Sequence, residues 1–219
     1  GSFFCMKKIS LWVGILALLT IFVAVMWGQQ IEFVLGGAMI NIGYRLQDHL
    51  ADYDLEHHEV TPPQIWQRFL DQNHMAASVR STFPRSSRHP VVAMVACMDG
   101  RLDTNEIAGD TRHYYYILRL AGSVLSEKEE EMLELAVVNG VKVVVFTTHT
   151  DCAAEKTAAD PEKSKMFPKL TEAVHERTAR FEEFMARPII KERVQKGDLI
   201  VKWVDLDTMT EEVVPHDPK

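Results

Sequence analysis

Cysteine and positive charge are both scarce in this sequence, and each scarcity excludes a class of protein. Only Cys5, Cys97 and Cys152 occur among 219 residues, an odd number that excludes a disulfide framework. Lysine and arginine (24) are outnumbered by acidic residues (31), which gives a net charge of −7. A nucleic-acid partner is not expected, because phosphate binding needs a basic face. The few thiols are instead candidates for metal ligands or catalytic groups.

Charge is absent from the longest apolar run of the chain. Residues 9–27, ISLWVGILALLTIFVAVMW, carry no charged side chain, and the run is close to the ~20 residues that cross a bilayer as a helix. A signal peptide is the alternative, although the run is long for one and no A-x-A-like cleavage site follows it. Lys7 and Lys8 precede the run, and mixed, soon acidic, charges follow it. The run therefore predicts a single-pass membrane anchor at residues 1–28, and the positive-inside rule places the rest of the chain on the non-cytoplasmic (periplasmic) face.

Composition divides the rest of the chain into two further segments. Residues 29–60 begin with an apolar stretch interrupted by glycines and end with an acidic stretch before Pro62 and Pro63. We expect a helical stalk and linker there. Residues 61–219 are expected to form one folded domain, which opens with a helix at about 63–79.

Continuous apolar runs at 91–98, 114–122 and 141–149 predict strands of a parallel sheet that is covered on both faces. Between the second and third runs, SEKEEEMLELAVVNG (126–140) predicts a helix with a capping box at its start and a glycine at its end. A longer helical region at about 165–187 and a last strand at 198–208 follow. The predicted fold class is α/β, a mainly parallel β-sheet flanked by helices, with an N-terminal transmembrane helix.

Three potential metal ligands follow two of the predicted strands. Cys97 ends the first run, His149 ends the third, and Cys152 comes three residues later. Because sites in open parallel sheets form beyond the carboxyl ends of the strands, we expect these side chains to meet. Two thiolates and an imidazole suit zinc, and a fourth position left free is typical of a catalytic site. A lone buried cysteine is usually a small apolar side chain, but three such residues beside Asp99 and Arg101 favour a metal centre.

The motifs CMDGRLD (97–103), ILRLAGS (117–123) and HTDC (149–152) resemble the signature of the β-class carbonic anhydrases, in particular its small C-M-D-x-R-L-D / H-T-D-C branch. The resemblance covers roughly residues 65–210 and leaves the membrane segment outside. It implies Zn²⁺ on Cys97, His149 and Cys152, and reversible hydration of CO₂ to bicarbonate by a zinc-bound hydroxide. It also implies that Asp99 orients the hydroxide and that Arg101 holds Asp99. Relatives are dimers or larger, so the resemblance implies a homo-oligomer in which the segment at about 64–80 embraces the neighbouring subunit.

Two positions depart from the family pattern, since Leu120 stands where asparagine is common and Ala153 where glycine is common. They remove no ligand but leave the substrate open, because related zinc sites on this fold act on CS₂ or COS. The other alternative is an anchored structural subunit of a membrane complex with weak or lost activity. An anchor would also suit a membrane-protein partner that uses CO₂ or bicarbonate. The sequence ranks none of the histidines that could carry the product proton: His74, His89, His113, His175 and His216.

Overall fold

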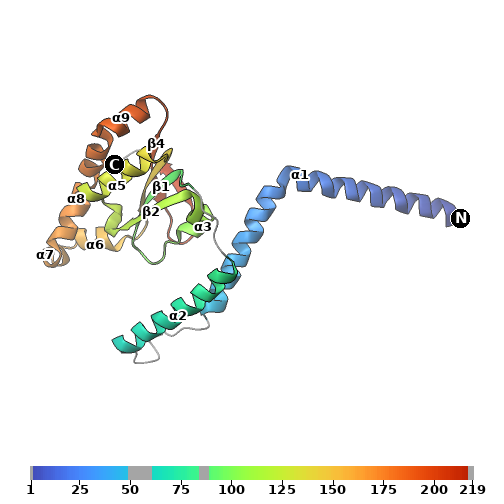
Figure 1. Cartoon of the computed structure of the whole chain (residues 1–219), viewed down its shortest axis with the longest axis horizontal. Coiled ribbons are helices and arrows are strands. Elements are labelled where there is room, and N and C mark those ends of the chain that lie inside the picture. Colours follow the sequence, from blue (N-terminus) through green and yellow to red (C-terminus); the bar gives the residue numbers. More distant parts are fainter. Residues whose placement is uncertain (1, 49–60, 84–88, 217–219) are drawn as a thin grey trace. The chain divides into compact units, whose positions relative to one another are not determined.

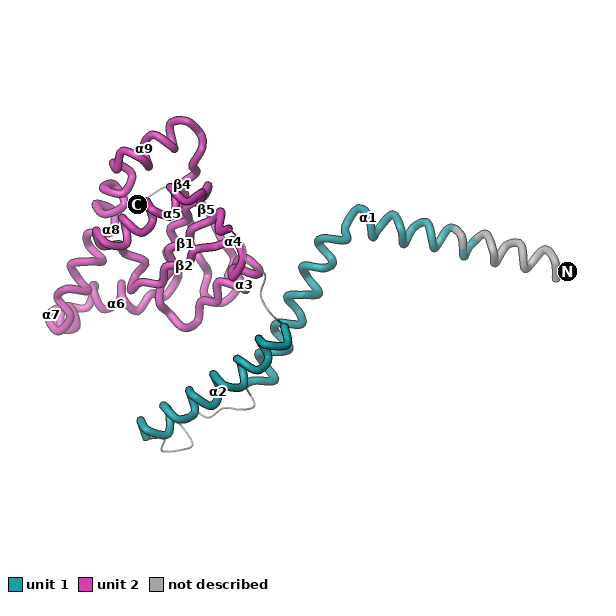
Figure 2. Tube along the Cα trace, in the orientation of Figure 1, with its two compact units in different colours: residues 1–84 teal, residues 85–219 magenta. Residues whose placement is uncertain are grey.

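Two units of different architecture make up the chain in the computed structural model, which describes residues 2–48, 61–83 and 89–216 (Figure 1). Unit 1 spans residues 1–84 and unit 2 spans residues 85–219 (Figure 2). The boundaries expected from the sequence, after residues 28 and 60, both fall inside unit 1. Within the predicted stalk and linker (29–60), residues 49–60 lie outside the described residues.

The described part of unit 1 consists of the helices α1 (Ser2–Asp48) and α2 (Pro62–Thr82). Helix α1 contains one stretch, Ile15–Gln47, with mean hydropathy 1.7, that is long and apolar enough to cross a membrane. A signal sequence near an N-terminus passes the same test of length and composition. Helix α2 begins where the Thr61 N–H donates to the Gln64 side chain at 2.8 Å, and its first turn holds prolines, which lack an N–H that would need a partner there. No residue of α2 is buried.

Unit 2 is built on a five-stranded sheet with the order β2-β1-β3-β4-β5. Strands β1 (Val92–Cys97), β2 (Tyr115–Leu120), β3 (Val143–His149) and β4 (Ile200–Leu206) pair in parallel. The predicted α/β class, with a mainly parallel sheet flanked by helices, is therefore confirmed. Strand β5 (Val213–His216) pairs antiparallel with β4. The sequence does not predict β5, because VVPH is short and contains a proline, which a strand tolerates at the edge of a sheet.

Helices fill the connections between the parallel strands (Figure 1). Between β1 and β2 lie α3 (Thr104–Ala108) and α4 (Thr111–Tyr114), and between β2 and β3 lie the 3-10 turn η1 (Ala121–Ser123) and α5 (Glu127–Val138). The predicted capping box is present at α5, where the Ser126 N–H donates to Glu129 at 2.8 Å. The connection from β3 to β4 carries α6 (Ala153–Ala159), α7 (Lys163–Met166), α8 (Pro168–Ala186) and α9 (Pro188–Gln195).

One face of the sheet forms the hydrophobic core with α5, α8 and α9. At its centre the ring of Phe146, 1% exposed, lies 5.1 Å from the rings of both Phe181 and Trp203. The opposite face is less covered than the sequence predicts. On that face Val145 is half-buried and Ile200 is 52% exposed. The apolar runs therefore mark a sheet whose second face stays partly open in the described chain.

Candidate metal centre

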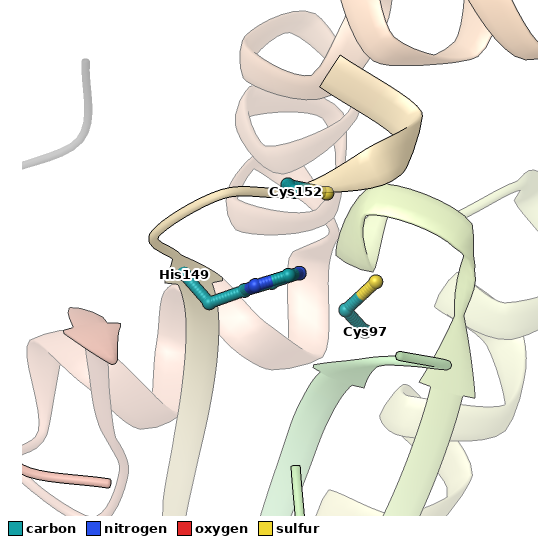
Figure 3. Close-up of side chains that lie close together, drawn as sticks. All are labelled: Cys97, His149 and Cys152. Carbon is teal, nitrogen blue, oxygen red and sulfur yellow. The ribbon is translucent and has the colours of Figure 1, made fainter. Parts of the chain in front are cut away.

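The strands β1 and β3 bring the predicted ligands together at one edge of the sheet. They are parallel neighbours, paired from Val92↔Val143 to Val95↔Phe146, so their carboxyl ends lie side by side. Cys97 ends β1, His149 ends β3, and Cys152 directly precedes α6. The three side chains are buried and point toward one another (Figure 3), with their potential ligand atoms all within 4.8 Å of each other.

The imidazole of His149 is arranged as a metal ligand would be. Its Nδ1 lies 2.9 Å from the carbonyl oxygen of Thr150, to which it donates a hydrogen bond. In the neutral ring the other nitrogen, Nε2, is then the acceptor, and it is buried with no hydrogen-bond partner among the described residues. Leaving such an atom unsatisfied is costly, and a cation held between Nε2 and the two sulfurs would satisfy it.

The two cysteine sulfurs also suit a metal. The hydrogen bond from the Cys152 thiol is the main cause that holds the pKa of Cys97 well below its usual range. The same hydrogen bond, together with burial, raises the pKa of Cys152. The shared hydrogen bond therefore favours the thiolate form of Cys97, and a metal ion would displace the proton that remains on the pair. Two sulfurs and an imidazole nitrogen form a donor set of the kind that zinc prefers.

An ion pair between Asp99 and Arg101 follows β1 directly. The guanidinium of Arg101 donates two hydrogen bonds to the carboxylate of Asp99, from Nε to Oδ1 at 3.0 Å and from Nη2 to Oδ2 at 2.7 Å. The Arg101 backbone N–H adds a third hydrogen bond to Oδ1 at 3.0 Å. These hydrogen bonds, the side-chain ones above all, hold the pKa of Asp99 well below its usual range. Asp99 is therefore an ionised acceptor at any physiological pH.

The second motif, ILRLAGS, supports the site from β2. Arg119 donates from Nε to the Cys97 carbonyl at 3.2 Å and from Nη2 to the Asp99 carbonyl at 2.5 Å, so it holds the backbone that follows β1. Gly122 has φ +63°, and a Cβ there would stand 3.3 Å from Nη2 of Arg177. Both the conformation and the close approach require glycine. Arg119 and Gly122 both belong to the motif ILRLAGS, but the sequence alone predicts no role for either.

The two departures from the family pattern have little local effect on the backbone. Ala153 is the first residue of α6 and is exposed, and it has no positive φ that would require glycine. Leu120 is half-buried and packs against the hydrophobic core.

Sequence reasoning missed one charged neighbour of the ion pair, Asp151. Its Oδ2 accepts a hydrogen bond from Nη1 of Arg101 at 2.9 Å, and its carbonyl accepts one from Nη2 at 3.0 Å. Lys156 forms an ion pair with its other carboxylate oxygen. The available signal was the acidic residue inside HTDC, between two predicted ligands.

A cavity of about 490 Å³ lies beside His149, against α8. Its polar lining includes Thr148, Thr150, Arg177 and Asp205. His149 is itself part of the lining, whereas Cys97, Cys152, Asp99 and Arg101 are not, so among the predicted site residues the cavity reaches only the imidazole. Of the candidate proton carriers, His216 lines this cavity and pairs with Asp205 at 3.3 Å, whereas His113 pairs with Asp110 at 3.2 Å.

Comparison with known proteins agrees with this geometry. Residues 92–196 match the family model for carbonic anhydrase. The family model thus recognises residues 92–196 as a carbonic anhydrase domain. The carbonic anhydrase domain shares its fold with solved β-carbonic anhydrases, and at the identities below the likeness is one of fold. No curated protein matches the chain in sequence.

Three solved structures show this likeness of fold. A tetrameric β-carbonic anhydrase of the filamentous ascomycete Sordaria macrospora matches with a TM-score of 0.55 and 16% identity, over 71% of this chain and 98% of that one. The β-carbonic anhydrase CafA of Aspergillus fumigatus gives 0.53 and 17%, over 70% and 91%. A carbonic anhydrase of Streptococcus mutans gives 0.53 and 22%, over 73% and 100%.

Proposed function

We propose that this protein is a zinc-dependent carbonic anhydrase that interconverts CO₂ and bicarbonate at a membrane surface. The observation that carries the proposal is the buried group of Cys97, His149 and Cys152 beside the Asp99–Arg101 ion pair, in a domain of the carbonic anhydrase family.

The three buried side chains would hold the metal through two sulfurs and Nε2 of His149. When bound, zinc supplies Lewis acidity, which lowers the pKa of a water molecule from 15.7 toward about 7 and makes hydroxide available at neutral pH. The hydrogen bond from Nδ1 of His149 to the Thr150 carbonyl fixes the tautomer and the ring orientation. Burial of the three residues keeps competing water away from the ligand bonds.

Asp99 would orient the nucleophile. An ionised carboxylate can only accept hydrogen bonds, so it turns the O–H bond of the nucleophile toward itself and leaves a lone pair free for the carbon of CO₂. Arg101 keeps Asp99 ionised and fixes the direction of its oxygens through the two-pronged contact. Correct orientation of this kind contributes to catalysis without a new bond.

Metal content and substrate assays on the full chain in detergent test this proposal. We expect about one zinc per chain by mass spectrometry of metals, and CO₂ hydration in stopped flow that chelation abolishes and zinc restores. CS₂ and COS hydrolysis should be measured in parallel. Hydrolysis of either without CO₂ hydration would replace the proposed substrate, and a zinc-loaded protein inactive on all three would support the structural-subunit alternative.

We also infer that the protein acts as a homodimer or larger oligomer. Apolar surface supports this inference in each unit: Trp66 and Phe69 of α2 are 59% and 53% exposed, and Ile200 on the open face of the sheet is 52% exposed. Neighbouring exposed aromatic side chains, such as Trp66 stacked on Phe69 with ring centroids 5.5 Å apart, are typical of an interaction surface. The Sordaria macrospora structure is of a tetrameric enzyme.

A membrane location is the last part of the proposal. The apolar stretch Ile15–Gln47 of α1 supports an anchor, and Lys7 and Lys8 before it favour a cytoplasmic N-terminus. CO₂ crosses a bilayer freely and bicarbonate does not, so an enzyme held at the non-cytoplasmic face would decide which species reaches a membrane-protein partner. Protease added to intact spheroplasts should digest residues 61–219. Full protection, while a known periplasmic domain is cut, would reverse the orientation.

A further inference from the structure

The guanidinium of Arg101 is held by two carboxylates that come from two different loops. On one edge, Nε and Nη2 donate to Asp99, which follows β1. On the other edge, Nη1 donates to the Asp151 carboxylate at 2.9 Å and Nη2 to the Asp151 carbonyl at 3.0 Å. A guanidinium carries five N–H donors in one plane. Because Arg101 has partners on both edges, the loop after β1 and the loop after β3 together fix the plane of the guanidinium.

The contact with Asp99 does not by itself tie Arg101 to the ligands on β3. The same fork between residues i and i+2 occurs at Asp110 and Arg112, where Nε and Nη2 of Arg112 lie 2.6 and 2.8 Å from the two carboxylate oxygens of Asp110. The fork is therefore a local motif that a short loop can make. Asp151 adds the connection across the site, because it lies between His149 and Cys152 on the loop that carries both of these predicted ligands.

The backbone of Asp151 indicates that its side chain has a use. Its φ is +62°, in the left-handed region that glycine adopts most easily. Aspartate tolerates this conformation better than most residues but still at a cost. Its carboxylate is in turn held by an ion pair with Lys156 of α6. A strained residue whose side chain is held at both oxygens is typical of a functional site.

We propose that Asp151 is a positioning residue for the hydration reaction, which holds Arg101, and through it Asp99, in register with the loop that carries His149 and Cys152. The inference rests on the proposed function of the site. Asp151 acts through Arg101, so it changes how often Asp99 is correctly oriented and not whether zinc binds. The side chains of Arg101 and Asp151 are 46% and 51% exposed. An ion pair between side chains this exposed should change kcat by a factor of about five at most.

The decisive variant is Asp151→Asn in the full chain, since asparagine keeps the shape and accepts the positive φ. We expect kcat for CO₂ hydration to fall about fivefold, with KM and zinc content unchanged. Asp160→Asn is the matched control, because it removes an equal charge from unit 2 in a loop beyond α6, and it should stay within about twofold of the parent. An equal loss of kcat in both variants, or a loss of zinc with Asp151→Asn, would overturn the positioning role.

A double-mutant cycle separates action through Arg101 from a general structural effect. If Asp151 acts through Arg101, Asp151→Asn should lower kcat no further in a chain that already carries Arg101→Ala. Additive losses would contradict the proposal. Should Asp151→Asn fold poorly, Asp151→Gly removes the side chain and also suits the positive φ, and it carries the same expectation.

An NMR measurement tests the contact without relying on activity. The Nη1–H signal of Arg101, which comes from the donor to the Asp151 carboxylate and is assigned from its loss in Arg101→Lys, should exchange with water about fivefold faster in Asp151→Asn than in the parent or in Asp160→Asn. Unchanged exchange would overturn the inference even in an active enzyme. A parent protein that binds zinc but hydrates no CO₂ would refute the proposed function, while the exchange rate would still decide whether Asp151 holds Arg101.

Discussion

Unit 2 has a buried apolar core, whereas the large apolar side chains described in unit 1 are mostly exposed. In unit 2, Phe146 is 1% exposed and packs among aromatic rings on one face of the sheet. In unit 1, Phe69 of α2 is 53% exposed, and no residue of α2 is buried. The same residue type therefore has opposite surroundings in one chain. Hydrophobic composition alone therefore does not locate a core, because the apolar side chains of a helix can instead contact lipid or another subunit.

The chemistry follows the same division, since every residue assigned to the metal centre lies in unit 2. Cys97→Ser and Cys152→Ser should each lose bound zinc and all measurable CO₂ hydration, because a catalytic zinc site needs three protein ligands. His149→Ala should do the same. Cys5→Ser, which removes the cysteine of unit 1, is the matched control and should keep both zinc and activity. Full zinc occupancy in any of the three ligand variants would break the assignment.

The ion pair should have the next largest effect. Arg101→Ala and Asp99→Asn should keep zinc but lower kcat about a hundredfold, since misplacement of an orienting group costs about that much. Arg112→Ala removes the matching fork with Asp110 elsewhere in unit 2, and its kcat should stay close to that of the parent. Stopped-flow hydration with zinc analysis on each variant makes the comparison. Near-normal turnover in Arg101→Ala would contradict the role given to the pair.

Truncating one phenylalanine in each unit tests the contrast in burial directly. Phe146→Ala should lower the free energy of unfolding of unit 2 by about 3–5 kcal/mol, because it opens a cavity among Phe181, Phe184 and Trp203. Phe69→Ala should change this free energy of unfolding by less than about 0.5 kcal/mol, because Phe69 is not part of the core of unit 2. Denaturant titration followed by tryptophan fluorescence measures both. Equal losses would show that α2 is packed as firmly as the sheet.

A charge on α2 should change assembly while leaving the fold of unit 2 intact. Phe69→Asp places a carboxylate on apolar surface that we propose to be covered by a second subunit, so the mass in detergent should fall toward that of a monomer. Asn73→Asp adds the same charge at an exposed polar position of α2 and should leave the mass unchanged. Multi-angle light scattering distinguishes the two. A parent chain that is already monomeric and fully active would remove the basis for the oligomer.

Local patterns made much of unit 2 predictable. The apolar runs predict β1, β2, β3 and β4 because a strand buried in a parallel sheet reads as a continuous run. The start of α5 is predicted because the capping interaction between Ser126 and Glu129 spans only three residues. Cys97 and His149 could be expected to meet, because the carboxyl ends of parallel strands lie at the same edge of the sheet. The short, proline-containing β5 carries no comparable signal.

The sequence by itself thus determined the strands β1 to β4, the start of α5 and the apolar helix α1, since each depends on residues that are neighbours along the chain. Only the tertiary structure decided which side chains meet from distant loops. Arg101 reaches Asp151 across 50 positions, and the Asp103 N–H donates to Glu211 across 108. Both acceptors lie at residues with positive φ, 62° at Asp151 and 55° at Glu211. Such contacts depend on the register of the sheet and on left-handed turns, and neither leaves a periodic trace in the sequence.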